Sequence, residues 1–149
     1  MTGDVEFTSA AYQNGKTQTY SFTGDGTTVL AFFPGAFTGV CTEEMCNFRD
    51  SMKDFEDLDT EVIGISVDTP PALEEFAKKN NLDFTLVSDT SKEIAESYGV
   101  KTKMPELEYE IASRAVFIVD NGEVVYSEIL ENPSNLPDFN ALKQKLREL

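Results

Sequence analysis

Short apolar runs alternate with amphipathic stretches along the whole chain. Four runs rich in strand-forming residues are bounded by glycine, proline or acidic residues, which predicts buried strands; they cover residues 27–33, 61–67, 84–87 and 115–119. Apolar residues at helical spacing predict helices over residues 41–58 and 91–98, a third opened by Pro70 and Pro71, and a fourth with Phe139, Leu142, Leu146 and Leu149 on one face. The order of these elements predicts an α/β fold with a mixed central sheet flanked by helices.

Two turn signals add hairpins to this picture. Asn14-Gly15 separates two polar and aromatic runs and predicts an N-terminal β-hairpin that ends at Phe22. Residues 120–123 separate the strand at 115–119 from a further strand at 124–127, which predicts a second hairpin. Residues 106–110 are expected in a loop. No linker, repeat or low-complexity tract divides residues 1–149, so we expect a single domain.

The first predicted helix begins at a cysteine. Cys41 follows a buried strand and lies in the first helical turn, where free backbone N–H groups and the helix dipole favour a thiolate. It heads an apolar stripe that continues through Met45, Phe48, Met52 and Phe55. Cys46 lies about 140° from the centre of that stripe, at roughly 100° per residue, on a polar face. A free cysteine is usually a small buried apolar residue, but the polar face argues against this for Cys46, and the helix-start position argues against an inert thiol at Cys41.

Composition excludes several kinds of chemistry. The 149 residues are 40% hydrophobic, enough for one core, and include two cysteines and no histidine. A Ser-His-Asp or Cys-His hydrolase and a His-ligated zinc are therefore excluded. Two sulfurs alone make a poor metal site, so we expect no metal and no cofactor. Two cysteines are also too few for a disulfide scaffold and suit a redox role in a reducing compartment, so we expect a cytoplasmic protein.

The net charge bears on partners. Asp and Glu number 27 against 12 Lys and Arg, for a formal charge of −15. Such a surface repels phosphate backbones and anionic lipids, so neither nucleic acid nor a membrane is an expected partner. The N-terminus has no targeting pattern, and no apolar run is long enough for a membrane span. The acidic surface suits a salt-rich cytoplasm or an ordinary acidic protein, and the sequence leaves both open.

The residues around Cys41 resemble a known family. Pro34, Thr38 and Cys41 form the P-x-x-x-T-x-x-C signature of peroxiredoxins, and residues 113–120 resemble the segment that supplies their active-site arginine, here Arg114. The resemblance implies a thioredoxin-like fold and a thiol peroxidase. Residues 41–50 are similar to the peroxiredoxin Q or bacterioferritin-comigratory-protein group, whose second cysteine lies five residues after the first. Residues 34–40 look more like the one-cysteine branch called alkyl hydroperoxide reductase E.

The resemblance implies a role for each site residue. Cys41 attacks the peroxide, Thr38 offers its hydroxyl to it, and Arg114 stabilises the thiolate and the developing oxyanion. Glu44 orients the arginine, and Pro34 shields the thiolate from water. Three of these residues also have a purely structural interpretation. Thr38 is then a helix N-cap, Arg114 part of a strand-end ion pair and Pro34 a turn residue.

The role of Cys46 determines how the Cys41 sulfenic acid is reduced in the expected catalytic cycle. The resemblance implies that Cys46 resolves the Cys41 sulfenic acid as a disulfide that a thioredoxin-like donor reduces. Cα atoms five residues apart in a helix are about 8.7 Å apart, and a disulfide spans about 4.4 to 6.8 Å, so the helix would have to unwind. The alternatives are a one-cysteine peroxidase that uses an external thiol, a non-enzymatic redox sensor or holdase, and a thiol–disulfide reductase. Phe37 is a candidate contact of a homodimer.

Overall fold

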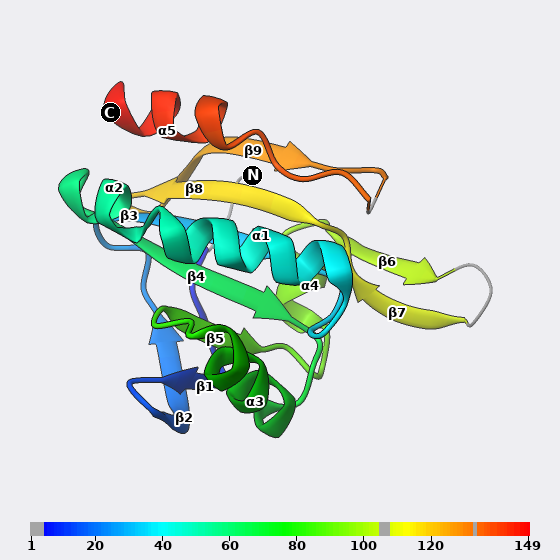
Figure 1. Ribbon diagram of the computed structural model, residues 1–149. Helices are drawn as coiled ribbons and strands as arrows, with labels where there is room; N and C mark the ends of the chain where they lie inside the picture. The colour runs from blue at the N-terminus through cyan, green and yellow to red at the C-terminus, as the bar shows by residue number, and fades with distance from the viewer. Residues whose placement is uncertain (1–4, 105–107, 133) are drawn as a thin grey trace.

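A seven-stranded mixed sheet forms the centre of the computed structural model, which describes residues 5–104, 108–132 and 134–149 (Figure 1). The strand order is β2-β1-β5-β4-β3-β8-β9. The strands are β1 (Phe7–Gln13), β2 (Lys16–Phe22), β3 (Thr27–Phe32), β4 (Thr60–Ser66), β5 (Thr85–Ser88), β8 (Ala115–Asp120) and β9 (Glu123–Ile129). Strands β3, β4 and β5 run parallel, whereas β1 and β8 pair antiparallel with β5 and β3. The mixed sheet and both predicted hairpins are confirmed.

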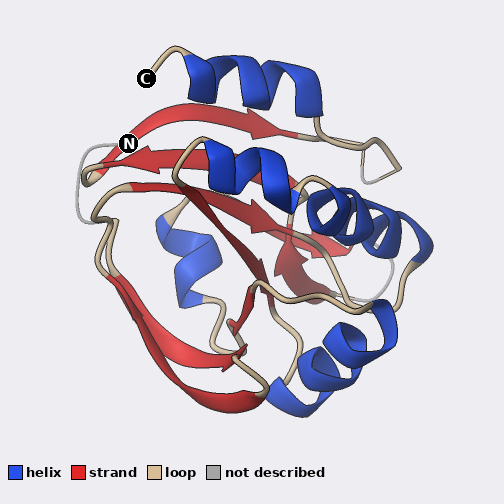
Figure 2. Ribbon diagram, turned by 60° about the vertical axis from the view of Figure 1, so that its left-hand side comes forward, coloured by secondary structure: helices blue, strands red, loops and turns tan. Residues whose placement is uncertain are grey.

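Helices cover both faces of this sheet and make a three-layer molecule (Figure 2). The helices are α1 (Gly39–Asp50), α2 (Met52–Asp57), α3 (Pro70–Asn80), α4 (Glu93–Ser97) and α5 (Phe139–Arg147). Side chains of α1, α2, α3 and α5 share one core cluster, and those of α4 belong to the other. Strand β3 contributes side chains to both core clusters, since Val29 and Ala31 face the first cluster while Leu30 and Phe32 face the second. No helix in the described parts of the chain is long and apolar enough to cross a membrane.

Two details of the helix predictions are wrong. The single helix over residues 41–58 is two helices, because the backbone of Ser51 leaves the helical region (φ −101°, ψ 4°) between α1 and α2. The apolar stripe survives the break, with Met45, Phe48 and Phe55 fully buried. Leu149 does not continue the buried face of α5, since that helix ends at Arg147 and the Leu149 side chain is 51% exposed.

A second, two-stranded sheet was not predicted. Strands β6 (Lys101–Met104) and β7 (Tyr109–Ala112) pair antiparallel and extend away from the main sheet (Figure 1). The loop predicted for residues 106–110 is therefore wrong at Tyr109 and Glu110, while 106 and 107 lie outside the described residues. Lysine and glutamate side chains occupy much of this hairpin, so it lacks the apolar alternation that identifies a strand. Backbone pairing and the Lys101–Glu110 ion pair (3.4 Å) hold it instead.

Candidate active site

Cys41 lies in the first turn of α1, directly after the loop that leaves β3. We call residues 34–38 the active-site loop. The helix begins at Gly39, so Cys41 is its third residue and lies beside the free N–H groups of the helix start. Its side chain is 1% exposed and joins the core cluster beneath α1, and the thiol is free. The predicted position of Cys41 at the edge of the core is confirmed.

Arg114 reaches Cys41 because of the sheet register. Strand β8 pairs with β3 so that Ala115 lies opposite Phe32, and this brings Arg114 beside the end of β3. Its guanidinium is 2% exposed; Nη2 donates to Cys41 Sγ at 3.3 Å and Nη1 to Glu44 Oε1 at 2.7 Å. Burial by itself lowers the pKa of Arg114, but Glu44 and Cys41 more than offset this and raise it above its usual value. A fixed cation therefore contacts the thiol.

Glu44 completes this buried triad. It lies three residues after Cys41, on the same face of α1, and is fully buried. Oε1 accepts the hydrogen bond from Arg114, while Oε2 has no hydrogen-bond partner among the described residues. Burial raises the pKa of Glu44 from 4.5 to about 7, against the opposing effect of the guanidinium. The carboxyl group thus accepts a hydrogen bond from Arg114 and has a pKa raised to about 7.

This raised pKa predicts a pH-dependent stability. Between pH 4.5 and about 7 the folded protein keeps a proton on Glu44 that the unfolded chain has lost. The Glu44 contribution to the free energy of unfolding is therefore full at low pH and is lost as the pH rises through about 7. Glu44→Gln retains an acceptor for Arg114 but cannot titrate, so this variant should become more stable relative to wild type as the pH rises.

Urea unfolding at about pH 5 and about pH 8 measures the difference, since the other carboxyl groups contribute equally to both proteins. Glu43→Gln is the matched control, because Glu43 is the exposed neighbour of Glu44 and should show no such trend. A difference between wild type and Glu44→Gln that stays constant with pH would contradict the assignment.

A cavity of about 300 Å³ opens beside Cys41. It is lined by Pro34, Thr38, Gly39, Val40, Cys41, Arg114 and Ser134. Four of the predicted site residues thus meet around one space, and Glu44 lies behind Arg114. Ser134, from the connection between β9 and α5, was missed; no motif marks it, and it lies far along the chain from Cys41.

Thr38 occupies the N-cap position of α1, but its side chain does not cap the helix. The hydroxyl donates instead to the Gly35 carbonyl at 3.0 Å. The Thr38 carbonyl accepts from both the N–H and the hydroxyl of Thr42. The alternative interpretation of the Thr38 side chain as a helix cap is therefore wrong. With its hydrogen committed to Gly35, the Thr38 oxygen can act as an acceptor.

Cys46 lies apart from this cavity. It is half-buried, with Sγ 3.9 Å from Oδ1 of Asn80 at the end of α3. Arg49 pairs with Asp50 at 3.0 Å and donates to the Asn80 carbonyl at 2.6 Å, so it joins α1 to α3. Helix α1 is continuous from Gly39 to Asp50, and the two cysteines are therefore held apart on different faces of it.

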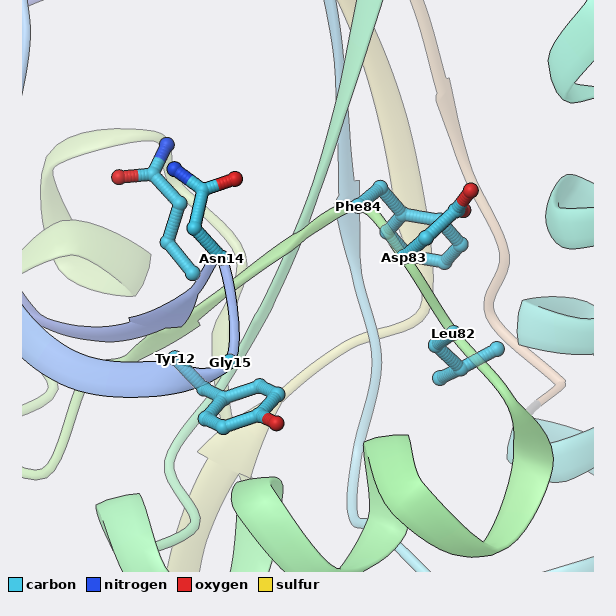
Figure 3. A pocket seen from close by; sticks show the side chains of 7 residues that line it. Tyr12, Asn14, Gly15, Leu82, Asp83 and Phe84 are labelled. Atoms are coloured by element: carbon cyan, nitrogen blue, oxygen red, sulfur yellow. The ribbon is translucent and has the colours of Figure 1, made fainter.

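A second cavity, of about 290 Å³, lies between the turn of the β1–β2 hairpin and the segment before β5 (Figure 3). Figure 3 shows Tyr12, Asn14 and Gly15 on the hairpin side, and Leu82, Asp83 and Phe84 on the segment that leads into β5. It contains neither cysteine nor arginine. None of the site residues predicted from the sequence lines this second cavity.

Known proteins resemble this chain in both sequence and fold. The AhpC/TSA family matches residues 4–127. Chloroplastic peroxiredoxin Q of Populus jackii is 37% identical over 113 residues, which cover 76% of this chain and 52% of that protein. Peroxiredoxin Bcp of Escherichia coli (strain K12) is 38% identical over 95 residues, 62% of this chain and 60% of that protein. The matched region thus spans little more than half the length of these curated relatives.

A solved structure extends the similarity over nearly the whole fold. Peroxidoxin BcpB from Mycobacterium tuberculosis superposes with a TM-score of 0.80 at 27% identity, covering 98% of this chain and 97% of that one. Its thioredoxin-like architecture agrees with the mixed sheet described above. Because the family match covers most of the chain, the chain belongs to the AhpC/TSA family, with relatives among the peroxiredoxins called Q and Bcp.

Proposed function

We propose that this chain is a thiol-dependent peroxidase in which Cys41 is the nucleophile. The contact of Arg114 Nη2 with Cys41 Sγ at 3.3 Å, beside a cavity, carries the proposal. The thiolate attacks one oxygen of a hydroperoxide, an S–O bond forms and the O–O bond breaks. Cys41 becomes a sulfenic acid, and the leaving oxygen takes a proton and departs as water or an alcohol. Arg114 stabilises the negative charge as it moves from sulfur to that oxygen.

The surroundings of Cys41 favour this step. Pro34 and Val40 line the cavity and limit the approach of water to the thiolate, while Thr38 supplies a polar group for the peroxide. A cavity of about 300 Å³ is larger than hydrogen peroxide requires. We therefore propose both hydrogen peroxide and small organic hydroperoxides as substrates.

Cys46 is the proposed resolving residue. Its thiolate attacks the Cys41 sulfenic sulfur, an S–S bond forms and hydroxide leaves as water. Helix α1 must unwind for this, since the helix holds the two Cα atoms about 8.7 Å apart and a disulfide spans at most about 6.8 Å. A thioredoxin-like dithiol then reduces the disulfide. Two free cysteines suit the reducing cytoplasm, which is the compartment we propose.

Turnover distinguishes this function from its alternatives. Purified protein should consume hydrogen peroxide and cumene hydroperoxide continuously when dithiothreitol, or thioredoxin with its reductase, is present. With thioredoxin and its reductase as the reductant, a redox sensor would react once per thiol and stop, whereas a thiol–disulfide reductase would reduce disulfides without consuming peroxide. Either of those outcomes would reject the peroxidase.

Cys46→Ser tests the resolving step by itself. We expect its first oxidation by peroxide to proceed at the wild-type rate, because Cys46 lies outside the cavity at Cys41. Turnover with thioredoxin should be lost, while a small thiol should still support it. In wild type, hydrogen exchange across residues 38–50 should rise on oxidation, and in Cys46→Ser it should not. Oxidised wild type that keeps a stable sulfenic acid, with Cys46 still open to alkylation, would mean a one-cysteine enzyme.

A homodimer that pairs around the active-site loop stays a prediction. Phe37 is 50% exposed at the tip of that loop, although its ring also packs edge to face on Phe76 within the same chain. The exposed half of the ring is the surface available to a second copy.

A further inference from the structure

A carboxylate from another part of the chain holds the active-site loop. The N–H of Ala36 donates to Asp68 Oδ2 at 2.7 Å. The same oxygen accepts the Ser66 hydroxyl at 2.7 Å. Asp68 follows β4 and precedes α3, so the contact joins two segments 32 residues apart. Hydrogen bonds to a carboxylate are among the stronger ones in proteins.

Hydrogen bonds with two buried serines fix the position of Asp68. Ser66, at the end of β4, is fully buried and also accepts a hydrogen bond from the Asp68 N–H at 3.3 Å. Ser88, at the end of β5, is buried and donates its hydroxyl to the Asp68 carbonyl at 2.6 Å. The ends of two central strands therefore set the position of the Asp68 carboxylate.

The bond from Asp68 acts on a peptide group that also contacts Thr38. The peptide between Gly35 and Ala36 gives its N–H to Asp68 and accepts the Thr38 hydroxyl at its C=O. A hydrogen bond at one end of an amide strengthens the bond at the other. Asp68 thus sets the orientation of the peptide that holds the Thr38 hydrogen, and leaves the lone pairs of the Thr38 oxygen for a ligand in the cavity.

The next residue shows that the loop needs such support. Phe37 has φ +66°, a conformation that bulky side chains rarely adopt and that persists only when the surroundings impose it. Its ring packs on Phe76, with centroids 5.4 Å apart, and Lys79 Nζ lies 5.9 Å from its centroid. Both contacts come from α3, the helix that follows Asp68. The loop is therefore held on one side by Asp68 and on the other by α3.

We infer that Asp68 is a positioning residue for the peroxide step, because it fixes the 35–36 peptide and through it presents Thr38 as a hydrogen-bond acceptor for the O–H of the bound hydroperoxide. This inference rests on the proposed peroxidase function. Asp68 does not touch the reacting atoms. It determines the geometry in which the O–O bond lies against the Cys41 sulfur.

Asp68→Ala should separate peroxide chemistry from thiol reactivity. Misplacement of a reacting group by about 1 Å costs up to about a hundredfold in rate, so we expect the rate constant of Cys41 with peroxide to fall about tenfold to a hundredfold. Alkylation of Cys41 by iodoacetamide should not slow, since it needs no bound hydroperoxide and the Arg114 contact remains. Asp68→Asn keeps an oxygen acceptor for Ala36 and should recover most of the peroxide rate.

Asp89→Ala is the matched control. Asp89 is buried next to the end of β5 and accepts two backbone N–H bonds, from Ile94 and Ala95 of α4, away from the active-site loop. This variant should lose stability and keep the peroxide rate. Asp68→Ala that reacts with peroxide as fast as wild type, or that slows equally toward peroxide and iodoacetamide, would overturn the role of Asp68. Wild type that consumes no peroxide would instead overturn the proposed function.

Discussion

Cys41→Ser should lose peroxide consumption altogether, a fall of at least about a thousandfold, because a serine hydroxyl does not ionise near neutral pH and cannot replace a thiolate. Serine differs from cysteine by one atom, and residue 41 keeps its place in α1 beside Arg114, so the fold should persist. Peroxide consumption with dithiothreitol measures the loss, and thermal unfolding checks the fold.

Cys46→Ser is the matched control for this experiment, since it removes the other thiol of the same helix and should still undergo the first oxidation. Peroxide consumption by Cys41→Ser at the wild-type rate would exclude Cys41 as the nucleophile. Loss of activity together with loss of the folded state would not distinguish chemistry from folding, so Cys41→Ala serves as a second variant that adds no buried hydroxyl.

Arg114→Ala should have the second-largest effect, on activity and stability together. The guanidinium donates to Cys41 and Glu44 from a position that is 2% exposed. Loss of one donor to a developing oxyanion costs about 10² to 10³ in rate. Loss of one partner of a buried ion pair costs about 3–5 kcal/mol, because the other charge remains buried. Stopped-flow oxidation and urea unfolding measure the two effects.

A double variant separates the effect of Arg114 on the peroxide rate from its effect on stability. Arg114→Met with Glu44→Gln leaves no uncompensated carboxylate, so most of the lost stability should return while the peroxide rate stays low. Arg147→Ala, at the exposed end of α5, should change neither quantity. Arg114→Lys keeps the charge but not the planar fork that reaches two partners, so its rate should lie between those of wild type and Arg114→Ala. A double variant as active as wild type would remove Arg114 from the proposed mechanism.

The order of secondary structure was predictable because its signals are local. The apolar run of β3, the following loop and the stripe through Met45 and Phe48 identify a strand, a turn and a helix from neighbouring residues alone. The same local pattern placed Cys41 at a helix start and Cys46 on another face of that helix. It failed at Ser51 and in the β6–β7 hairpin, where cap geometry and backbone pairing outweigh the apolar pattern.

Most of the site residues, Arg114 and Glu44 included, could be predicted from the family resemblance, but the hydrogen bonds of Thr38 and Asp68 could not. Cys41, Thr38 and Pro34 lie within eight residues and can be recognised as one motif. The Arg114 contact spans 73 residues and exists because β8 pairs with β3 in one register. Asp68 and Ser134 carry no signal in the sequence, since an acid after a strand and a serine in a connection are ordinary residues.

By itself, the sequence identified Cys41 as the candidate nucleophile at a helix start, excluded histidine chemistry and predicted the α/β order of elements. Each of these depends on residue type and on spacing of a few positions. The resemblance had named Arg114, and the tertiary structure showed how closely it approaches the thiol, which peptide Asp68 holds and which way the Thr38 hydroxyl points. The physical reason is that hydrogen bonds and desolvation act over a few ångströms in space, and only the packed sheet brings residues distant in the chain within that range.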